Sequence, residues 1–147
     1  MTESTLKKPV VSLVISVWNR KEDLRENLAT IRQQTVPADQ VIVVDNDSSD
    51  GTPEMVIEEF PEVQLIRMPH SQYGACETFN VGFSSAKGDF VGILDDDVIL
   101  PVTFGILCRR RCCRPTRGAR PTLCGWSTGS PTCTLCPAGN YQTSNNS

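Results

Sequence analysis

Between residues 9 and 104 the chain alternates between short apolar runs and longer segments of mixed polarity. Apolar, mainly β-branched residues fill positions 11–17 (VSLVISV) and 40–45 (QVIVVD), a pattern typical of strands buried on both faces of a sheet. Two further apolar runs, 63–68 (VQLIRM) and 90–95 (FVGILD), predict a third and a fourth strand. The pattern therefore predicts four strands separated by three connecting segments.

The first connecting segment has apolar residues at helical spacing. Leu24, Leu28 and Ile31 recur with the period of one helix face and predict a helix. Asn19 is followed three residues later by Glu22, so Asn19 is the predicted N-terminal cap of that helix.

The other two segments also predict helices. The second helix is expected to start at Thr52, because Pro53 suits the first helical turn. Apolar residues at helical spacing over 76–86 predict the third, and Gly88 is expected to end it. Strands that alternate with helices require a parallel sheet with crossover connections. We therefore expect an α/β fold with a Rossmann-like, doubly wound parallel sheet.

Polar loops follow each predicted strand. In a doubly wound sheet the ligand crevice lies beyond the carboxyl ends of the strands, where the strand order reverses. The loops expected there are residues 16–19, 45–50, 69–74 and 95–97. Candidate binding residues are therefore sought in these four loops.

Three consecutive carboxylates, Asp95, Asp96 and Asp97, end the fourth predicted strand. Adjacent like charges repel, and burying them without a partner is costly. A shared Mg²⁺ or Mn²⁺ would offset that repulsion, because these ions favour carboxylate and phosphate oxygens. If the strand geometry persists, Asp95 and Asp97 face one side and Asp96 the other. A solvent-exposed acidic loop is the alternative interpretation.

Three other polar residues in or beside these loops each have two interpretations. Asp45 could accept an N–H group from a nucleobase such as uracil, or it could cap the loop that follows it. Arg67 could face a phosphate or lie on the surface. His70, the one histidine of the chain, is expected to be solvated.

The segments VSLVISVWNRKEDLRENLATI, VIVVDNDSSDGT and YGACETFNVGFSSAKGDFVGILDDDVILP resemble, in order and spacing, the family 2 glycosyltransferases with the GT-A fold. The resemblance covers residues 9–104 and implies a GT-A nucleotide-sugar-binding half-domain there. It implies transfer of a sugar from a nucleotide-diphosphate sugar to a hydroxyl acceptor, with Mg²⁺ or Mn²⁺ as cofactor and with inversion. The acceptor, whether a saccharide, a lipid or another hydroxyl compound, is left open.

The resemblance also implies roles for individual residues. The implied base and ribose pocket consists of Ser16, Val17, Asn19, Asp45 and Asp47. Gly74 would lie at the donor crevice, and Asn80 would lie in the helix start behind it. Arg67 and Asp96 complete the donor-binding set. Asp95 would contact ribose or a metal-bound water. Asp97, with Asp95, would bind the metal that holds the diphosphate.

Two positions depart from the family pattern. The chain has Ser16-Val17-Trp18-Asn19 where the family often has a Pro-Thr-Tyr-Asn-like turn, and Asn46 where it often has a second aspartate. An inverting enzyme also needs a carboxylate base for the acceptor hydroxyl, which the family supplies from a later segment. No Asp or Glu follows Asp97, so we expect this chain to lack the base and the acceptor half.

The composition changes abruptly near Phe104. Residues 1–97 carry a net charge of −9, residues 98–147 carry +6, and six of the seven cysteines lie in the second part. Residues 105–147 have low hydrophobicity and no periodicity, so we expect a disordered or aberrant tail. The enrichment of this tail in Arg, Pro, Cys, Gly and Thr suggests that the reading frame is lost near Phe104, which resequencing of the coding DNA would test.

Other functions remain open for the two parts of the chain. In the tail, Cys133 and Cys136 form a CxxC motif that could belong to a zinc module, and the arginines of residues 109–120 could bind nucleic acid or anionic lipid. The cysteine spacing is irregular and no aromatic residues interleave the arginines, so no nucleic-acid partner is expected.

Residues 9–104 also permit a non-catalytic nucleotide-binding fragment, or a receiver-like phosphoacceptor domain with aspartates at its strand ends. A dinucleotide-dependent enzyme is disfavoured, because no G-x-G-x-x-G follows the first predicted strand. The apolar run near the N-terminus is too short to span a bilayer. We therefore expect a cytoplasmic or membrane-peripheral protein.

Overall fold

The computed structural model describes residues 9–105, 122–127 and 130–137. Within residues 9–105, four parallel strands belong to its sheet: β1 (Val11–Val17), β2 (Gln40–Asp45), β3 (Gln64–Arg67) and β4 (Phe90–Leu94). Three helices connect them in turn: α1 (Lys21–Arg32), α2 (Thr52–Glu59) and α3 (Ala75–Ser85). The predicted α/β, Rossmann-like architecture is confirmed.

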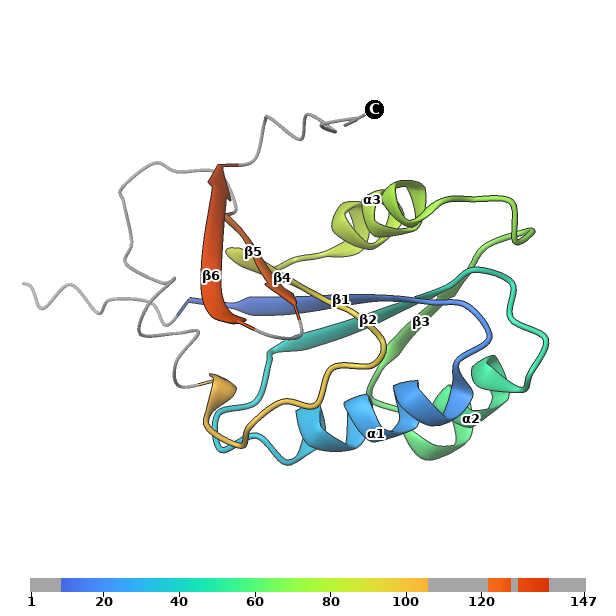
Figure 1. Cartoon of the computed structure of the whole chain (residues 1–147), viewed down its shortest axis with the longest axis horizontal. Coiled ribbons are helices and arrows are strands. Elements are labelled where there is room, and N and C mark those ends of the chain that lie inside the picture. The colour runs from blue at the N-terminus through green and yellow to red at the C-terminus, as the bar shows by residue number, and fades with distance from the viewer. Residues whose placement is uncertain (1–8, 106–121, 128–129, 138–147) are drawn as a thin grey trace, which may run out of the picture.

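The strand order is β3-β2-β1-β4 in this part of the sheet (Figure 1). The chain steps outward from β1 to β3 and then returns to place β4 on the other side of β1. The strand order therefore reverses between β1 and β4, which is where a doubly wound sheet forms its ligand crevice. Val17 pairs with Asp45, and Asp45 pairs with Arg67, so these strands end at a common edge.

Two strands that the sequence pattern did not predict lie within the tail. β5 (Thr122–Ser127) pairs parallel to β4, and β6 (Ser130–Pro137) pairs antiparallel to β5. Strands can pair through their backbone N–H and C=O groups without an alternating pattern of apolar side chains, so the sequence pattern gave no sign of these two. Without β5, the backbone groups of β4 on the side away from β1 would be unpaired. The arginine-rich segment 109–120 lies outside the described residues.

Two apolar clusters cover the two faces of the sheet. In Figure 1, α1 and α2 lie on one face and α3 lies on the other. Leu24, Leu28 and Ile31 of α1 are all buried in the first cluster, as their spacing predicted. Val14 and Ile42 belong to the second cluster, on the side of α3. Because both faces of β1 and β2 are covered, these strands read as continuous apolar runs.

Two predicted helix ends are wrong. Asn19 is not the cap of α1: the helix begins at Lys21, and Asn19 has a left-handed φ of 51°. Gly88 does not end α3, which stops at Ser85. A Cβ at Gly88 would lie 2.7 Å from the backbone nitrogen of Ser12, so the glycine permits a close approach of two backbones.

None of the helices in residues 9–105 combines the length and the apolar character needed to cross a membrane.

Candidate functional site

The loops after β1 and β2 are tied together at the carboxyl edge of the sheet. The backbone amide of Asn19 donates to Ser48 Oγ (2.9 Å), and Asn19 Oδ1 accepts from the backbone amide of Ser49 (2.8 Å). The amide of Asn46 continues the ladder to the carbonyl of Val17 (2.9 Å). Asn19 therefore acts as a bridge between two loops, a role that its positive φ allows because asparagine tolerates that conformation.

A single carboxylate, Asp50, caps the first turns of both α1 and α2. Its Oδ2 accepts from the backbone amide of Lys21 (2.9 Å), and its Oδ1 accepts from the amide of Thr52 (3.0 Å) and from the Thr52 hydroxyl. The first turn of a helix has backbone amides without partners in the helix and favours a nearby negative charge. The Asp50 carboxylate meets both needs at the N-termini of α1 and α2. The two helices that flank the edge are thereby held at a fixed spacing.

This cap predicts a pH-dependent stability. Partial burial would raise the pKa of Asp50, but hydrogen bonds from Thr52 and from the Lys21 amide outweigh it, so the pKa lies below its ordinary value. A lowered carboxyl pKa stabilises the fold above the unfolded-state pKa, and this contribution is lost as the pH falls through the folded-state pKa. Asp50→Asn is therefore expected to melt below wild type at neutral pH, with the difference shrinking below about pH 4.

The measurement is the melting temperature of both proteins across that pH range. Glu58→Gln, at an exposed position of α2, is the control for the loss of one charge. A difference between Asp50→Asn and wild type that stays constant down to low pH would contradict the proposed cap.

Asp45 is buried at the end of β2, with a side chain that water does not reach. Its Oδ2 accepts from the backbone amide of Ser48 (3.1 Å) and lies 3.6 Å from Arg67 Nε. Its Oδ1 has no hydrogen-bond partner among the described residues. Asp45 therefore caps its loop and keeps one buried oxygen without a partner among the described residues, and such atoms are rare in native proteins.

Arg67 lies at the end of β3, half exposed, between two carboxylates. Besides the contact to Asp45, its Nη2 lies 3.7 Å from Asp47 Oδ1. Asp47 has a positive φ of 58°, so the loop turns sharply there. The structure thus gathers Asp45, Asp47 and Arg67, three of the predicted donor-binding residues, at one point of the edge.

The chain turns directly after β4, at Asp96 and Asp97, so the extended geometry on which the expected alternation of the three carboxylates depended does not persist. Asp95 and Asp97 are exposed, whereas the side chain of Asp96 is only 15% exposed. We call residues 95–98 the acidic turn. The strand-like geometry ends before the three carboxylates because β4 stops at Leu94, and side chains alternate regularly only within the strand.

Arg20, which the sequence analysis did not select, faces the acidic turn. Its guanidinium lies 3.3 Å from Asp97 Oδ2, 3.7 Å from Asp96 Oδ1 and 3.5 Å from Asp23 Oδ2. The sequence does hold a clue, because Arg20 lies in the loop after the first strand, one residue beyond the four-residue motif used for the prediction. The arginine offsets part of the negative charge of the turn.

Negative charge is nevertheless concentrated here. Burial raises the pKa of Asp96 to about 6; Arg20 opposes that rise, and the carboxylates of Asp97, Asp23 and Asp95 reinforce it. Burial, and then the charge of Asp97, also raise the pKa of Asp95. A cation near the turn would favour the ionised forms, so the donor set fits Mg²⁺ or Mn²⁺.

Within residues 9–105 no group of three or more His, Cys, Asp or Glu side chains has the arrangement of a complete metal site. Mg²⁺ is usually held by one or two carboxylates together with substrate phosphates. A cation at the acidic turn would therefore need oxygen ligands from a second molecule.

The other predicted site residues lie in different surroundings. Ser16 Oγ is 2.7 Å from Thr78 Oγ1, which links β1 to α3. The side chain of Val17 is buried in the core, so only its backbone is available to a ligand. Gly74 is exposed directly before α3, but Asn80 lies in the second turn of α3, so its predicted place at the helix start is wrong.

His70 is exposed, as predicted, in the loop after β3. Its ring stacks on that of Tyr73, with centroids 4.4 Å apart. The backbone carbonyl of Tyr73 accepts from Asn46 Nδ2 (2.9 Å). Asn46, a departure from the family pattern, therefore holds this loop against the end of β2.

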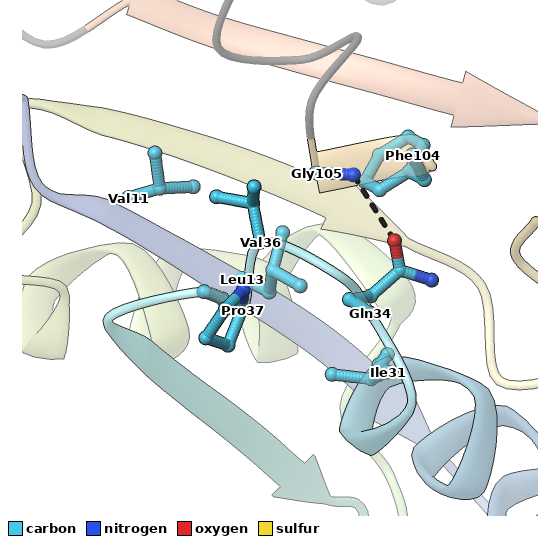
Figure 2. Close-up of a pocket in the computed structure, with 9 residues that line it drawn as sticks. Val11, Leu13, Ile31, Gln34, Val36, Pro37, Phe104 and Gly105 are labelled. Carbon is cyan, nitrogen blue, oxygen red and sulfur yellow. Dashed lines mark hydrogen bonds between the residues drawn. The ribbon is translucent and has the colours of Figure 1, made fainter. Parts of the chain in front are cut away.

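A small apolar pocket lies away from this edge, at the beginning of β1. Figure 2 shows it between Val11 and Leu13 of β1, the segment after α1, and Phe104. The lining lacks charged side chains, so the pocket has no group suited to a phosphate or a metal ion. The candidate site is therefore the carboxyl edge with its buried acceptor and acidic turn.

Known proteins are similar to this chain in sequence and fold. An uncharacterized glycosyltransferase of Haemophilus influenzae is 37% identical over 91 residues, which are 60% of this chain and 29% of that protein. The structure of the mannosyltransferase PcManGT of Pyrobaculum calidifontis, in complex with GDP-Man and Mn²⁺, is 30% identical with a TM-score of 0.56, over 65% of this chain and 30% of that one.

The fold of S. aureus TarS 1-349, in complex with UDP, is also similar. The TM-score is 0.63 at 22% identity, over 69% of this chain and 31% of that one. This chain spans less than a third of the length of each of these three proteins. The model of the family described as glycosyl transferase family 2 matches residues 12–104. The chain therefore belongs to glycosyl transferase family 2, and its described part has a GT-A-like fold.

Proposed function

We propose that this chain binds a nucleotide-diphosphate sugar and a divalent cation at the carboxyl edge of its sheet, as the donor-binding part of an inverting glycosyltransferase. The observation that carries the proposal is the buried Asp45 Oδ1, which has no partner among the described residues. An N–H group of a nucleobase would supply the missing hydrogen bond, and charge-assisted bonds of this kind are strong.

The role proposed for each residue follows from its position at the carboxyl edge of the sheet. Asp45 would orient the base at the end of β2, with Arg67 and Asp47 beside it. Asp95 and Asp97 would hold Mg²⁺ or Mn²⁺ beyond the end of β4. When bound, the cation would stabilise the charge that develops on the departing nucleoside diphosphate. The solved complex of PcManGT, which is 30% identical, with GDP-Man and Mn²⁺ supports a nucleotide-sugar donor and a divalent cation.

The acceptor and the base are not assigned to residues of this chain. An inverting transfer needs a carboxylate that takes the proton of the acceptor hydroxyl, and the chain has no Asp or Glu after Asp97. We propose that the base lies on another part of the complete enzyme or on a separate chain. The acceptor would be a saccharide, lipid or other hydroxyl compound.

A thermal-shift panel of UDP-, GDP- and dTDP-sugars, each with and without Mn²⁺, tests the proposal. Ligand at about 100 times its Kd stabilises a protein by about 2.7 kcal/mol, which raises the melting temperature of a domain of this size by several degrees. We expect one class of nucleotide sugar to give such a shift, and a larger one with Mn²⁺ than without. No shift with any member would overturn the proposal.

A second measurement separates a transferase from a non-catalytic nucleotide-binding fragment. Release of free nucleoside diphosphate from the selected donor reports slow transfer to water, which a protein that only binds does not catalyse. We expect Mn²⁺-dependent release from the wild-type chain and none from Asp95→Asn. Tight binding without any release would favour the non-catalytic alternative.

A further inference from the structure

Three polar side chains, two from α1 and one from the segment just after it, hold the backbone that follows β4. Asn27 and Thr30 lie three residues apart on one face of α1, and Gln34 lies two residues beyond the end of the helix. Asn27 Nδ2 donates to the backbone carbonyl of Val98 (2.6 Å) and to that of Asp95 (3.2 Å). One buried amide thus holds both ends of the acidic turn.

The other two side chains act further along the same segment. Thr30 Oγ1 accepts from the amide of Leu100 (3.2 Å). Gln34 Nε2 donates to the carbonyl of Pro101 (2.9 Å), and Gln34 Oε1 accepts from the amide of Gly105 (3.0 Å), the bond drawn in Figure 2. Side chains of α1 and of the segment just after it therefore replace the backbone partners that a regular strand or helix would supply.

Asn27 is an energetically unfavourable residue for a buried position. It is fully buried, and its Oδ1 has no hydrogen-bond partner among the described residues. An unpaired buried polar atom costs about 1–3 kcal/mol, and an apolar residue of the same shape avoids that cost. Packing alone would thus favour leucine at this position, which lies beside Leu28 on the buried face of α1.

We propose that Asn27 is the positioning residue for the divalent cation. It fixes the two ends of the acidic turn, so that the carboxylates of Asp95 and Asp97 are presented as a preformed pair. Without this restraint the two like charges, both at exposed positions, would move apart and would have to be brought together each time the ion binds. This inference rests on the proposed function of the acidic turn.

Two substitutions on the same face of α1 form a test and its matched control. Asn27→Leu removes both hydrogen bonds to the acidic turn without adding a charge, and leucine has a similar shape. Thr30→Val removes the bond to Leu100, which lies on the same segment but beyond the turn.

Mn²⁺ binding is measured by electron paramagnetic resonance titration, with Mn²⁺ alone and with UDP or GDP added. Loss of a residue that orients a metal ligand usually weakens metal affinity by about 10- to 100-fold. We expect a loss of that size in Asn27→Leu, wild-type affinity in Thr30→Val, and unchanged binding of the nucleotide without metal. Thermal melting establishes in parallel that each variant is folded.

The possible failures are distinguishable. If the wild-type chain binds no Mn²⁺ with either nucleotide, the proposed function fails and the inference fails with it. If wild type binds Mn²⁺ and a folded Asn27→Leu binds it equally well, the inference alone is overturned.

Discussion

Replacement of both Asp95 and Asp97 by asparagine is expected to abolish the Mn²⁺-dependent part of nucleotide-sugar binding. Two charged contacts worth about 1.5 kcal/mol each sum to about 3 kcal/mol, which is about a hundredfold in affinity. The measurement is the dissociation constant of the donor selected by the thermal-shift panel, determined by calorimetry with and without Mn²⁺. Metal-free binding, which depends on Asp45, is expected to be unaffected.

The same double substitution is expected to leave the fold at least as stable as wild type. The pKa values of Asp95 and Asp96 are raised, so at neutral pH the folded state holds these carboxylates ionised against burial and mutual repulsion. Neutral side chains remove that repulsion. The ion pair between Arg20 and Asp97 is exposed and contributes little. Lost binding together with lost stability would indicate a purely structural role.

A control for charge accompanies this experiment. Glu58→Gln removes one carboxylate from an exposed position of α2, away from the acidic turn. It is expected to leave the Mn²⁺ dependence of binding unchanged. An equal loss in both proteins would point to a general effect of net charge and would contradict a specific cation site.

Leu28→Ala is expected to destabilise the fold by about 2–5 kcal/mol, the range found for large-to-small substitutions in packed cores. Leu28 is 1% exposed and belongs to the cluster that α1 forms with β1. Alanine removes apolar contacts and leaves a cavity that the rigid sheet fills only partly. The free energy of unfolding, from urea titration monitored by circular dichroism, measures the effect.

Ile57→Ala is the matched control for that substitution. Ile57 lies on α2 but its side chain is 63% exposed, and substitutions at such sites usually change stability by less than about 0.5 kcal/mol. Similar losses for the two variants would show that α1 does not pack against the sheet as described.

The succession of elements in residues 9–104 was predictable because it depends on local spacing. Leu24, Leu28 and Ile31 have the period of a helix, and the runs of β1 and β2 are mainly apolar because both faces are covered. Helix ends were less predictable: Asn19 has the residue type and spacing of a cap, but its side chain bonds to Ser49 of a distant loop instead. Such competition between local and distant partners is invisible in a linear pattern.

The candidate site was predicted in outline and corrected in detail. The sequence located Asp45 and the three carboxylates at strand ends, and the sheet order places β1 and β4 at the reversal. It could not show that β4 ends before Asp95, or that Arg20 faces the turn. It also could not show that Asn27, on a helix 68 residues earlier, bonds to the carbonyl of Asp95.

The sequence by itself determined the order of strands and helices, the family and the acidic motif, because hydrophobic period and motif spacing are properties of neighbouring residues. Only the tertiary structure decided which polar groups meet: Asp50 with two helix ends, Asp45 with one oxygen left unpaired, and Asn27 with the acidic turn. These contacts join residues far apart in the chain, and hydrogen bonds depend on distances of a few tenths of an ångström that no pattern of residue types encodes.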